Sequence, residues 1–283
     1  MFFFIGAALF KRPENTYAVS SDAIERILED DASPLNHIAR LIPEGASVLD
    51  IGAGNGLLAQ VIKKSNKLVH IDGIEPNEFA ASLARPHYRS IFVGFSSEYL
   101  DVIHQSRYDY VVLADVVEHT VDPVEFLTEI CDHLPTSTKL FVSLPNIAFG
   151  GQRLALLNGA FTYVDSGLLE KTHLRFFTID SAKALFASIP LSCESITFLN
   201  RSFYRAEFSR NILKASFFQL LKLAFTPSAR AYQYLFILHK DERKNTAQHT
   251  FGSSPIKIIF DAFFYRPTFK KTAKFFIDFV KKR

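Results

Sequence analysis

Short apolar runs rich in β-branched residues alternate with amphipathic stretches along the first half of the chain. Each run has the length of a strand buried in a parallel sheet. The runs lie at Ser47 to Ile51, Leu68 to Ile74, Ser90 to Gly94, Tyr108 to Ala114 and Lys139 to Leu144. Apolar residues at helical spacing lie between them, at Gly56 to Lys64, Glu78 to Ala84, Ser97 to His104 and Val124 to Leu134. This alternation predicts an α/β fold in which crossover helices connect a parallel sheet.

The second half of the chain departs from this alternation and then resumes it. Between Asn146 and Thr178 several glycines indicate an irregular segment with a short helix, of the kind that carries functional residues. Beyond it the pattern predicts a helix over Thr178 to Ser188, a strand over Leu191 to Asn200, a helix over Glu207 to Phe225 and a strand over Tyr232 to His239. The sheet should therefore have about seven strands.

Charge and cysteine content narrow the class of protein. The 283 residues include 32 Lys and Arg and 29 Asp and Glu, a formal net charge of +3, so no specific nucleic-acid partner is expected. Cys131 and Cys193 lack the spacing of a zinc site and indicate reduced thiols of a cytoplasmic protein. No apolar run approaches the roughly 20 residues that a membrane span needs, which excludes a polytopic membrane protein.

A glycine-rich loop follows the first predicted strand. Its sequence is Asp50-Ile51-Gly52-Ala53-Gly54-Asn55-Gly56. Glycines let the backbone turn sharply and approach a ligand at the start of the next helix. A dinucleotide-binding loop needs its third glycine at position 57, where this chain has Leu57, and the Gly-Lys-Ser/Thr of a P-loop is absent. The loop therefore does not match a pyrophosphate site.

An acidic residue closes the second predicted strand. In the segment from His70 to Asn77, Glu75 lies at the strand end, where a carboxylate can accept two hydrogen bonds from a ribose diol. Asp72 competes for this role two residues earlier, but its mid-strand position suits a contact at the strand edge better. Glu75 is the preferred ribose ligand.

Three segments in order resemble those of class I S-adenosylmethionine-dependent methyltransferases. They are the glycine loop, the Glu75 strand end, and the segment from Tyr108 to Pro123 with its Glu118-His119 pair. The third resembles the subgroup that contains the ubiquinone-biosynthesis O-methyltransferases. Leu140 to Asn146 and Thr172 to Thr178 are also similar to family segments, so the resemblance covers about residues 40 to 240. It implies a Rossmann-like, mostly parallel seven-stranded sheet whose last strand is antiparallel, with helices on both faces.

The resemblance also implies a set of cofactor-binding residues. For S-adenosylmethionine these are Asp50, Gly52, Ala53, Gly54, Gly56, Glu75, Pro76, Ser96, Asp115 and Val116. One position departs from the family, because Phe95 replaces the Asp that usually hydrogen-bonds the adenine amino group. Phe95 could pack on the adenine face while Ser96 supplies the polar contact.

Histidines are the candidate catalytic groups. Methyl transfer from a sulfonium needs alignment and, for a hydroxyl acceptor, removal of a proton, so no metal is required and none is expected. His119, at the end of the fourth strand, and His173, in the returning segment, are the candidate bases. The alternative is that both only orient their loops. Arg175 suits a carboxylate or phosphate of the acceptor, and Asn146 is a further substrate-binding candidate.

The chain divides into three predicted parts. Residues 1–40 form an N-terminal helical cap, residues 41–240 the methyltransferase domain with a substrate-loop insertion at 146–178, and residues 241–283 a basic amphipathic helical tail. Residues 255–283 carry eight basic and two acidic residues. Such a helix suits an anionic membrane surface or a partner's groove, or it packs on its own domain. A cytoplasmic protein with peripheral membrane contact is expected.

The preferred function is methyl transfer to a hydroxyl oxygen of a small-molecule, glycan or lipid-linked acceptor. A quinone-type lipid, a sugar of a surface polysaccharide or another small metabolite would each fit. The alternative is a non-catalytic, methyltransferase-like binding or scaffold protein attached through its basic tail. Phe95 suggests this alternative, because it replaces the Asp that usually binds adenine. An NAD-dependent enzyme is the least favoured function, because Leu57 occupies the position where a dinucleotide-binding loop needs glycine.

Overall fold

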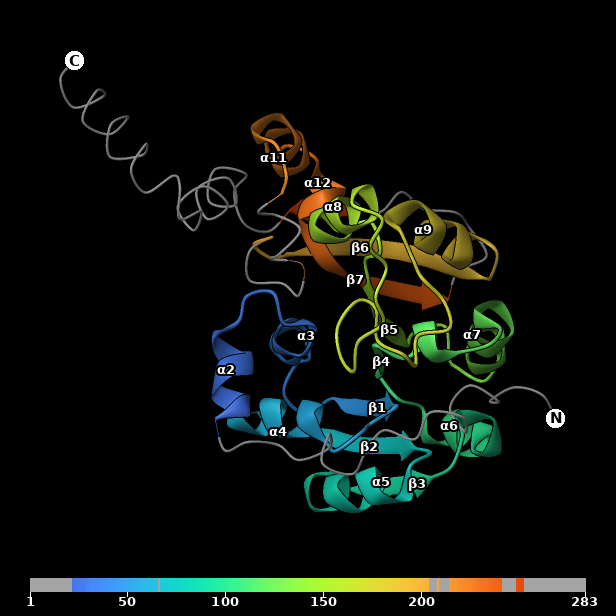
Figure 1. Ribbon diagram of the computed structural model, residues 1–283. Coiled ribbons are helices and arrows are strands. Elements are labelled where there is room, and N and C mark those ends of the chain that lie inside the picture. The colour runs from blue at the N-terminus through green and yellow to red at the C-terminus, as the bar shows by residue number, and fades with distance from the viewer. Residues whose placement is uncertain (1–21, 66, 204–207, 209–213, 241–247, 252–283) are drawn as a thin grey trace.

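A single twisted sheet organises the chain in the computed structural model, which describes residues 22–65, 67–203, 208, 214–240 and 248–251 (Figure 1). The strand order is β3-β2-β1-β4-β5-β7-β6-β8. The bounds are β1 (Ser47–Ile51), β2 (His70–Glu75), β3 (Ser90–Val93), β4 (Tyr110–Ala114), β5 (Lys139–Pro145), β6 (Leu191–Asn200), β7 (Ala231–Lys240) and β8 (Gln248–Phe251).

The pairing of the strands confirms the predicted fold class. Strands β1 to β5 pair in parallel, and β7 is antiparallel to both of its neighbours, β5 and β6. The seventh strand is therefore the antiparallel one, as expected. β8 was not predicted: it pairs in parallel with β6 at the sheet edge and lies inside the segment assigned to a helical tail.

Helices cover both faces of the sheet. The described helices are α2 (Ala23–Glu29), α3 (Pro34–Leu41), α4 (Leu57–Lys64), α5 (Glu78–Ala84), α6 (Leu100–Ser106), α7 (Pro123–Asp132), α8 (Gly150–Leu157), α9 (Ile179–Ala187), α11 (Phe217–Ala224) and α12 (Pro227–Arg230). Side chains of α6, α7 and α9 share one apolar core with the sheet, and those of α3 and α4 share the other. A third cluster joins α8, α11 and α12 beside the carboxyl end of β5.

Capping explains where two of these helices begin. Asp122 Oδ1 accepts hydrogen bonds at 3.0 Å from the backbone N–H groups of Val124 and Glu125, and Pro123 needs no partner at the first helical position. The predicted helix over Glu207 to Phe225 is not continuous: residues 214–216 are not helical, and residues 207 and 209–213 lie outside the described residues. Ser216 and Gln219 form a reciprocal capping box, so α11 begins only at Phe217.

The two ends of the chain are described in part. Helices α2 and α3 pack against the core that α4 shares with the sheet, whereas residues 1–21 and the predicted amphipathic helices of residues 252–283 lie outside the described residues. The division into cap, domain and tail stays a prediction. Among the described helices, none has both the length and the apolar character to cross a membrane.

Candidate active site

A cleft of about 770 Å³ opens at the carboxyl ends of the parallel strands. Open α/β sheets bind their ligands at this edge, where loops from neighbouring strands converge. Residues that follow β1, β2, β3 and β4 line one part of it, and residues of the loop from Gly167 to His173 line another. Leu35 of α3 also contributes to the lining, so an N-terminal helix reaches the site.

The glycine loop is shaped by two close approaches. Gly52 has a φ of +78°, and a Cβ atom there would lie 2.6 Å from Cγ2 of Val116, so only glycine fits. Gly54, with a φ of +54°, donates its N–H to Oε2 of Glu75 at 2.8 Å. The carboxylate of Glu75 thereby fixes the loop, and its other oxygen accepts the N–H of Asn77 at 2.8 Å.

Gly56 has a different role from the one expected. It does not line the cleft, and its φ of +84° makes it the left-handed residue before α4. A Cβ atom there would lie 3.0 Å from Cα of Ala84 and 3.2 Å from the ring of Tyr88. Its assignment as a cofactor-binding residue is corrected: Gly56 allows close packing of α4 on α5.

The acid of the loop is held in an apolar environment. Asp50 is 3% exposed, and its Oδ2 accepts a hydrogen bond from the Tyr88 hydroxyl at 2.5 Å. Burial raises the pKa of Asp50 to about 7, although the Tyr88 hydrogen bond opposes this shift; the charge of Glu75 adds to it. Near neutral pH, both the protonated and the ionised form of Asp50 are therefore populated.

Asp115 lies in the cleft at the end of β4 in a conformation that is rare for a residue with a side chain. Its φ is +56°. Its carboxylate accepts hydrogen bonds from the Ser143 hydroxyl at 2.6 Å and from the Gln233 amide at 2.9 Å, and its N–H donates to Ser143 Oγ at 2.9 Å. Neighbouring strands β5 and β7 thus hold Asp115 in place.

The two candidate catalytic histidines lie together. The ring centroids of His119 and His173 are 4.8 Å apart, and both residues line the cleft. Nδ1 of His119 lies 3.0 Å from the carbonyl of Thr172, and Nδ1 of His173 lies 3.1 Å from that of Leu168. Because a carbonyl only accepts, each Nδ1 carries the proton, which leaves the lone pair of the neutral ring on Nε2.

A buried carboxylate accompanies these histidines. Oε1 of Glu118 lies 4.0 Å from Nε2 of His173, and the Glu118 side chain is 1% exposed. One ligand atom from each of Glu118, His119 and His173 lies within 4.8 Å of the others, a group that could hold a metal ion. No metal site was predicted, because methyl transfer from a sulfonium does not require a metal.

The two predicted substrate-binding residues lie outside the cleft lining, which corrects their assignment. Asn146 is fully buried, and its amide donates to the carbonyls of Ser228 and Ala231 at 2.6 and 2.7 Å. The guanidinium of Arg175 donates to the carbonyl of Val121. Both side chains hold segments of backbone together.

Four further residues predicted to bind the cofactor line the cleft, and their role stays a prediction. They are Ala53, Pro76, Ser96 and Val116, and Phe95 lies beside Ser96. Sequence reasoning missed Tyr88, Ser143, Gln233, Glu170 and Thr172. Ser143 and Gln233 carry a signal that could have been used, since each is a polar residue in an otherwise apolar strand. Tyr88 carries no such signal, because only folding brings its hydroxyl to the Asp50 carboxylate.

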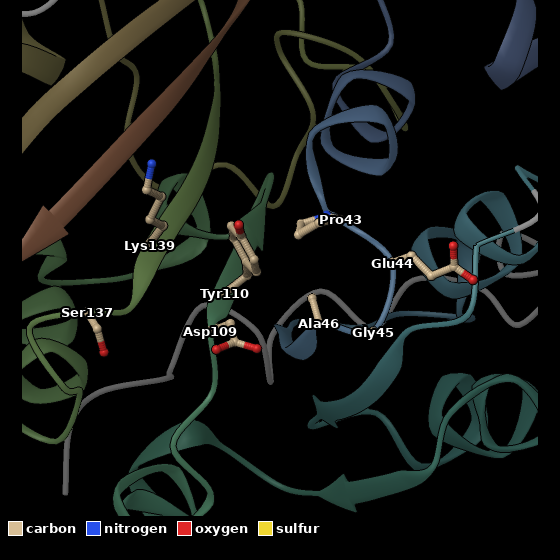
Figure 2. Close-up of a pocket in the computed structure, with 8 residues that line it drawn as sticks. All are labelled: Pro43, Glu44, Gly45, Ala46, Asp109, Tyr110, Ser137 and Lys139. Carbon is tan, nitrogen blue, oxygen red and sulfur yellow. The ribbon is translucent and has the colours of Figure 1, made fainter.

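A second hollow, of about 380 Å³, lies at the opposite edge of the sheet, where β1, β4 and β5 begin (Figure 2). Asp109 and Lys139 both line it. The carboxylate of Asp109 accepts the N–H of Ser47 at 2.9 Å, and Lys139 pairs with Glu194 at 2.7 Å. Asp109 and Lys139 are thus paired with groups of the neighbouring strands. The cleft at the carboxyl ends of the strands remains the candidate active site.

Comparisons with known proteins identify the family of the chain. Residues 20–195 match the model of a family described as "Methyltransferase domain". A ubiquinone biosynthesis O-methyltransferase of Shewanella is 28% identical over 109 residues, which are 36% of this chain and 44% of that protein. A second, from Coxiella burnetii, is 22% identical over 42% of this chain and 52% of its own. The chain thus spans about half the length of the curated relatives it matches.

Solved structures share the fold. A Thermotoga maritima protein, described as a possible histamine N-methyltransferase, gives a TM-score of 0.51 at 19% identity and covers 78% of this chain and 93% of its own. The plantazolicin methyltransferase BamL, solved with SAH and a substrate analogue, gives 0.52 at 14% identity over 85% and 95% of the two chains. At these identities the likeness concerns the fold alone.

Proposed function

Because the chain belongs to the methyltransferase-domain family, we propose that it transfers a methyl group from S-adenosylmethionine to an acceptor bound in the carboxyl-end cleft. The observation that carries the proposal is the meeting of Glu75, the Gly52–Gly54 loop and the histidine pair in one cleft. The loop, Glu75 and His119 follow three neighbouring parallel strands, and His173 joins them from the segment between α8 and α9.

The residues present fit the proposed cofactor. At Gly54, which lines the cleft, an added Cβ atom would meet no other atom within 4 Å, so a ligand can approach the backbone there. Both oxygens of Glu75 accept backbone N–H groups, and a carboxylate is a suitable acceptor for the hydroxyls of a ribose. Asp50 and Asp115 would face the cofactor's ammonium, and Phe95 and Ser96 its adenine. Bound S-adenosylmethionine supplies a methyl group on a sulfonium sulfur, which departs as a neutral thioether.

His119 is the proposed general base. Its Nδ1 proton is fixed on the Thr172 carbonyl, so the Nε2 lone pair can take the proton of an acceptor hydroxyl as the oxygen forms its bond to the methyl carbon. His173, with the same fixed tautomer, supports or shares this role. A hydroxyl oxygen of a small-molecule, glycan or lipid-linked acceptor is the preferred target, and residues 255–283 are proposed to contact a membrane surface.

Calorimetric titration with S-adenosylmethionine and with S-adenosylhomocysteine tests the cofactor site. We expect both to bind the wild-type protein. Glu75→Gln, which keeps the shape but removes the charge, should weaken binding about tenfold or more. Glu78→Ala is the matched control, because Glu78 is exposed on the adjoining helix. A folded wild-type protein that binds neither compound would refute the proposal and favour a non-catalytic scaffold.

A further inference from the structure

Three carboxylates line the cleft together with the histidine pair, at the end that the residues after β4 and the loop from Gly167 to His173 form. They belong to Asp115, Glu118 and Glu170, and all three residues line the cleft. Glu118 is fully buried and Glu170 is 6% exposed. Buried carboxylates are costly unless hydrogen-bond donors or positive charges face them.

The hydrogen bonds seen at Asp115 and Glu170 come from neutral donors. Asp115 accepts hydrogen bonds from Ser143 and Gln233, and Oε1 of Glu170 accepts one from the Thr172 hydroxyl at 2.5 Å. Burial raises the pKa of Asp115, the hydrogen bonds from Ser143 and Gln233 and the charge of His119 oppose this shift, and the charge of Glu170 adds to it. His119 and His173 supply the basic groups among the described lining residues.

The side chain of Arg175, expected to contact the acceptor, contacts a backbone carbonyl instead. Arg175 was a candidate partner for an acceptor carboxylate or phosphate, but its guanidinium is committed to the Val121 carbonyl. The acceptor therefore enters a space whose charges are predominantly negative. A carboxylate or phosphate placed there would meet like charges at low dielectric, whereas an ammonium or a hydroxyl would find acceptors for its protons.

We propose that this end of the cleft selects a methyl acceptor with hydrogen-bond donors and no negative charge near its reacting atom, and that it favours one carrying an ammonium group. Glu170 is the residue that we expect to discriminate between acceptors. It lines the cleft together with His119, but it is not part of the group formed by Glu118, His119 and His173. This inference rests on the proposed function and adds the charge class of the substrate.

Three probes that share a catechol and differ in charge test the inference. Dopamine is cationic, methyl 3,4-dihydroxyphenylacetate is neutral, and 3,4-dihydroxyphenylacetate is anionic. Turnover is measured with labelled S-adenosylmethionine, and binding to the complex with S-adenosylhomocysteine is measured by calorimetry. We expect the amine and the ester to exceed the acid by about tenfold or more in kcat/KM or in affinity. Equal or better use of the acid, or a panel in which neither the amine nor the ester binds, would overturn the inference.

A variant that lacks the charge of Glu170 tests whether this residue causes the discrimination between the acid and the amine. Glu170→Gln should raise the acid's kcat/KM relative to the amine's several-fold while leaving the affinity for S-adenosylhomocysteine unchanged. Asp165→Asn is the matched control: it removes the same charge from the same loop, but the Asp165 side chain is 83% exposed and pairs with Lys171. An unchanged acid-to-amine ratio in Glu170→Gln would refute the role of Glu170.

The cofactor titration separates the two proposals. If S-adenosylmethionine does not bind, the proposed function fails and the acceptor inference fails with it. If the cofactor binds and is weakened by Glu75→Gln, but the acid is the preferred probe, only the acceptor inference is overturned.

Discussion

The hydroxyl of Tyr88 donates a 2.5 Å hydrogen bond to Oδ2 of Asp50, the acid that opens the glycine loop. Tyr88 lies outside every motif, yet its ring also packs beneath Gly56 and Gly73. The pair therefore links the cofactor loop on β1 to the connection between α5 and β3. The Tyr88 hydrogen bond lowers the pKa of Asp50 against the larger, raising effect of burial.

Stability should depend on pH through Asp50. Its folded pKa, about 7, lies above the ordinary value of 3.8, so the folded state holds this proton more tightly than the unfolded state. Its contribution to stability is full below about pH 4 and is lost as pH rises to 7, with a slope of at most about 1.4 kcal/mol per pH unit. Denaturant unfolding of wild type and Asp50→Asn at pH 5 and pH 8 checks this. A stability difference between the two proteins that is the same at both pH values would contradict it.

Cofactor affinity should change with pH in the opposite direction. A cationic cofactor ammonium prefers ionised Asp50, so affinity for S-adenosylmethionine should rise between pH 6 and pH 8. Tyr88→Phe removes the hydrogen bond that lowers the Asp50 pKa, so the midpoint of this rise should move to higher pH. Calorimetry across the range measures both midpoints, and coincident curves would exclude the Tyr88 effect.

The support of Asp115 by two strands should appear as coupled mutational effects. Ser143→Ala and Gln233→Leu each remove a donor to the same carboxylate, so each should lower kcat/KM by about tenfold. Because both act through Asp115, the double variant should lose less than the product of the two single losses. A double-mutant cycle in kcat/KM measures the coupling, and fully independent effects would show that the two residues act separately.

His119→Ala and His173→Ala should lower turnover while S-adenosylhomocysteine affinity stays nearly intact. Loss of a general base costs about a hundredfold or more in rate. His104→Ala is the control, since His104 is exposed on α6. If both cleft variants turn over at the wild-type rate with the true acceptor, neither histidine is the base.

Zinc should inhibit the protein reversibly. Glu118, His119 and His173 offer three ligand atoms within 4.8 Å, and binding of Zn²⁺ would occupy the lone pair of the proposed base. We expect EDTA-treated protein to retain turnover, added Zn²⁺ to abolish it, and His173→Ala to need more Zn²⁺ for the same inhibition. Loss of turnover after EDTA treatment, with recovery on metal addition, would instead identify a required metal.

Residues 255–283 should carry the proposed membrane contact. Flotation with liposomes containing anionic lipid is expected to recover the full chain and not the chain lacking these residues, because the segment carries a net positive charge. Liposomes of neutral lipid are the control for the electrostatic part. Equal flotation of both chains, or of neither, would reject this role.

The sequence by itself determined the sheet, the glycine loop and the Glu75 position, because these depend on local signals. Apolar runs of strand length located β1 to β7 to within a few residues, and chain order placed Gly52, Gly54 and Glu75 at strand ends that parallel pairing brings to one edge. The same local reading failed for the start of α11 and for β8.

Only the tertiary structure decided which polar side chains reach the cleft. Arg175 and Asn146 are polar candidates in the sequence, as His173 is, yet the structure places both outside the cleft lining. Glu170 and Gln233, from segments without a motif, do line it. Strand identity follows from short-range periodicity. The direction of a side chain follows from which backbone groups, distant in sequence, need a partner after packing.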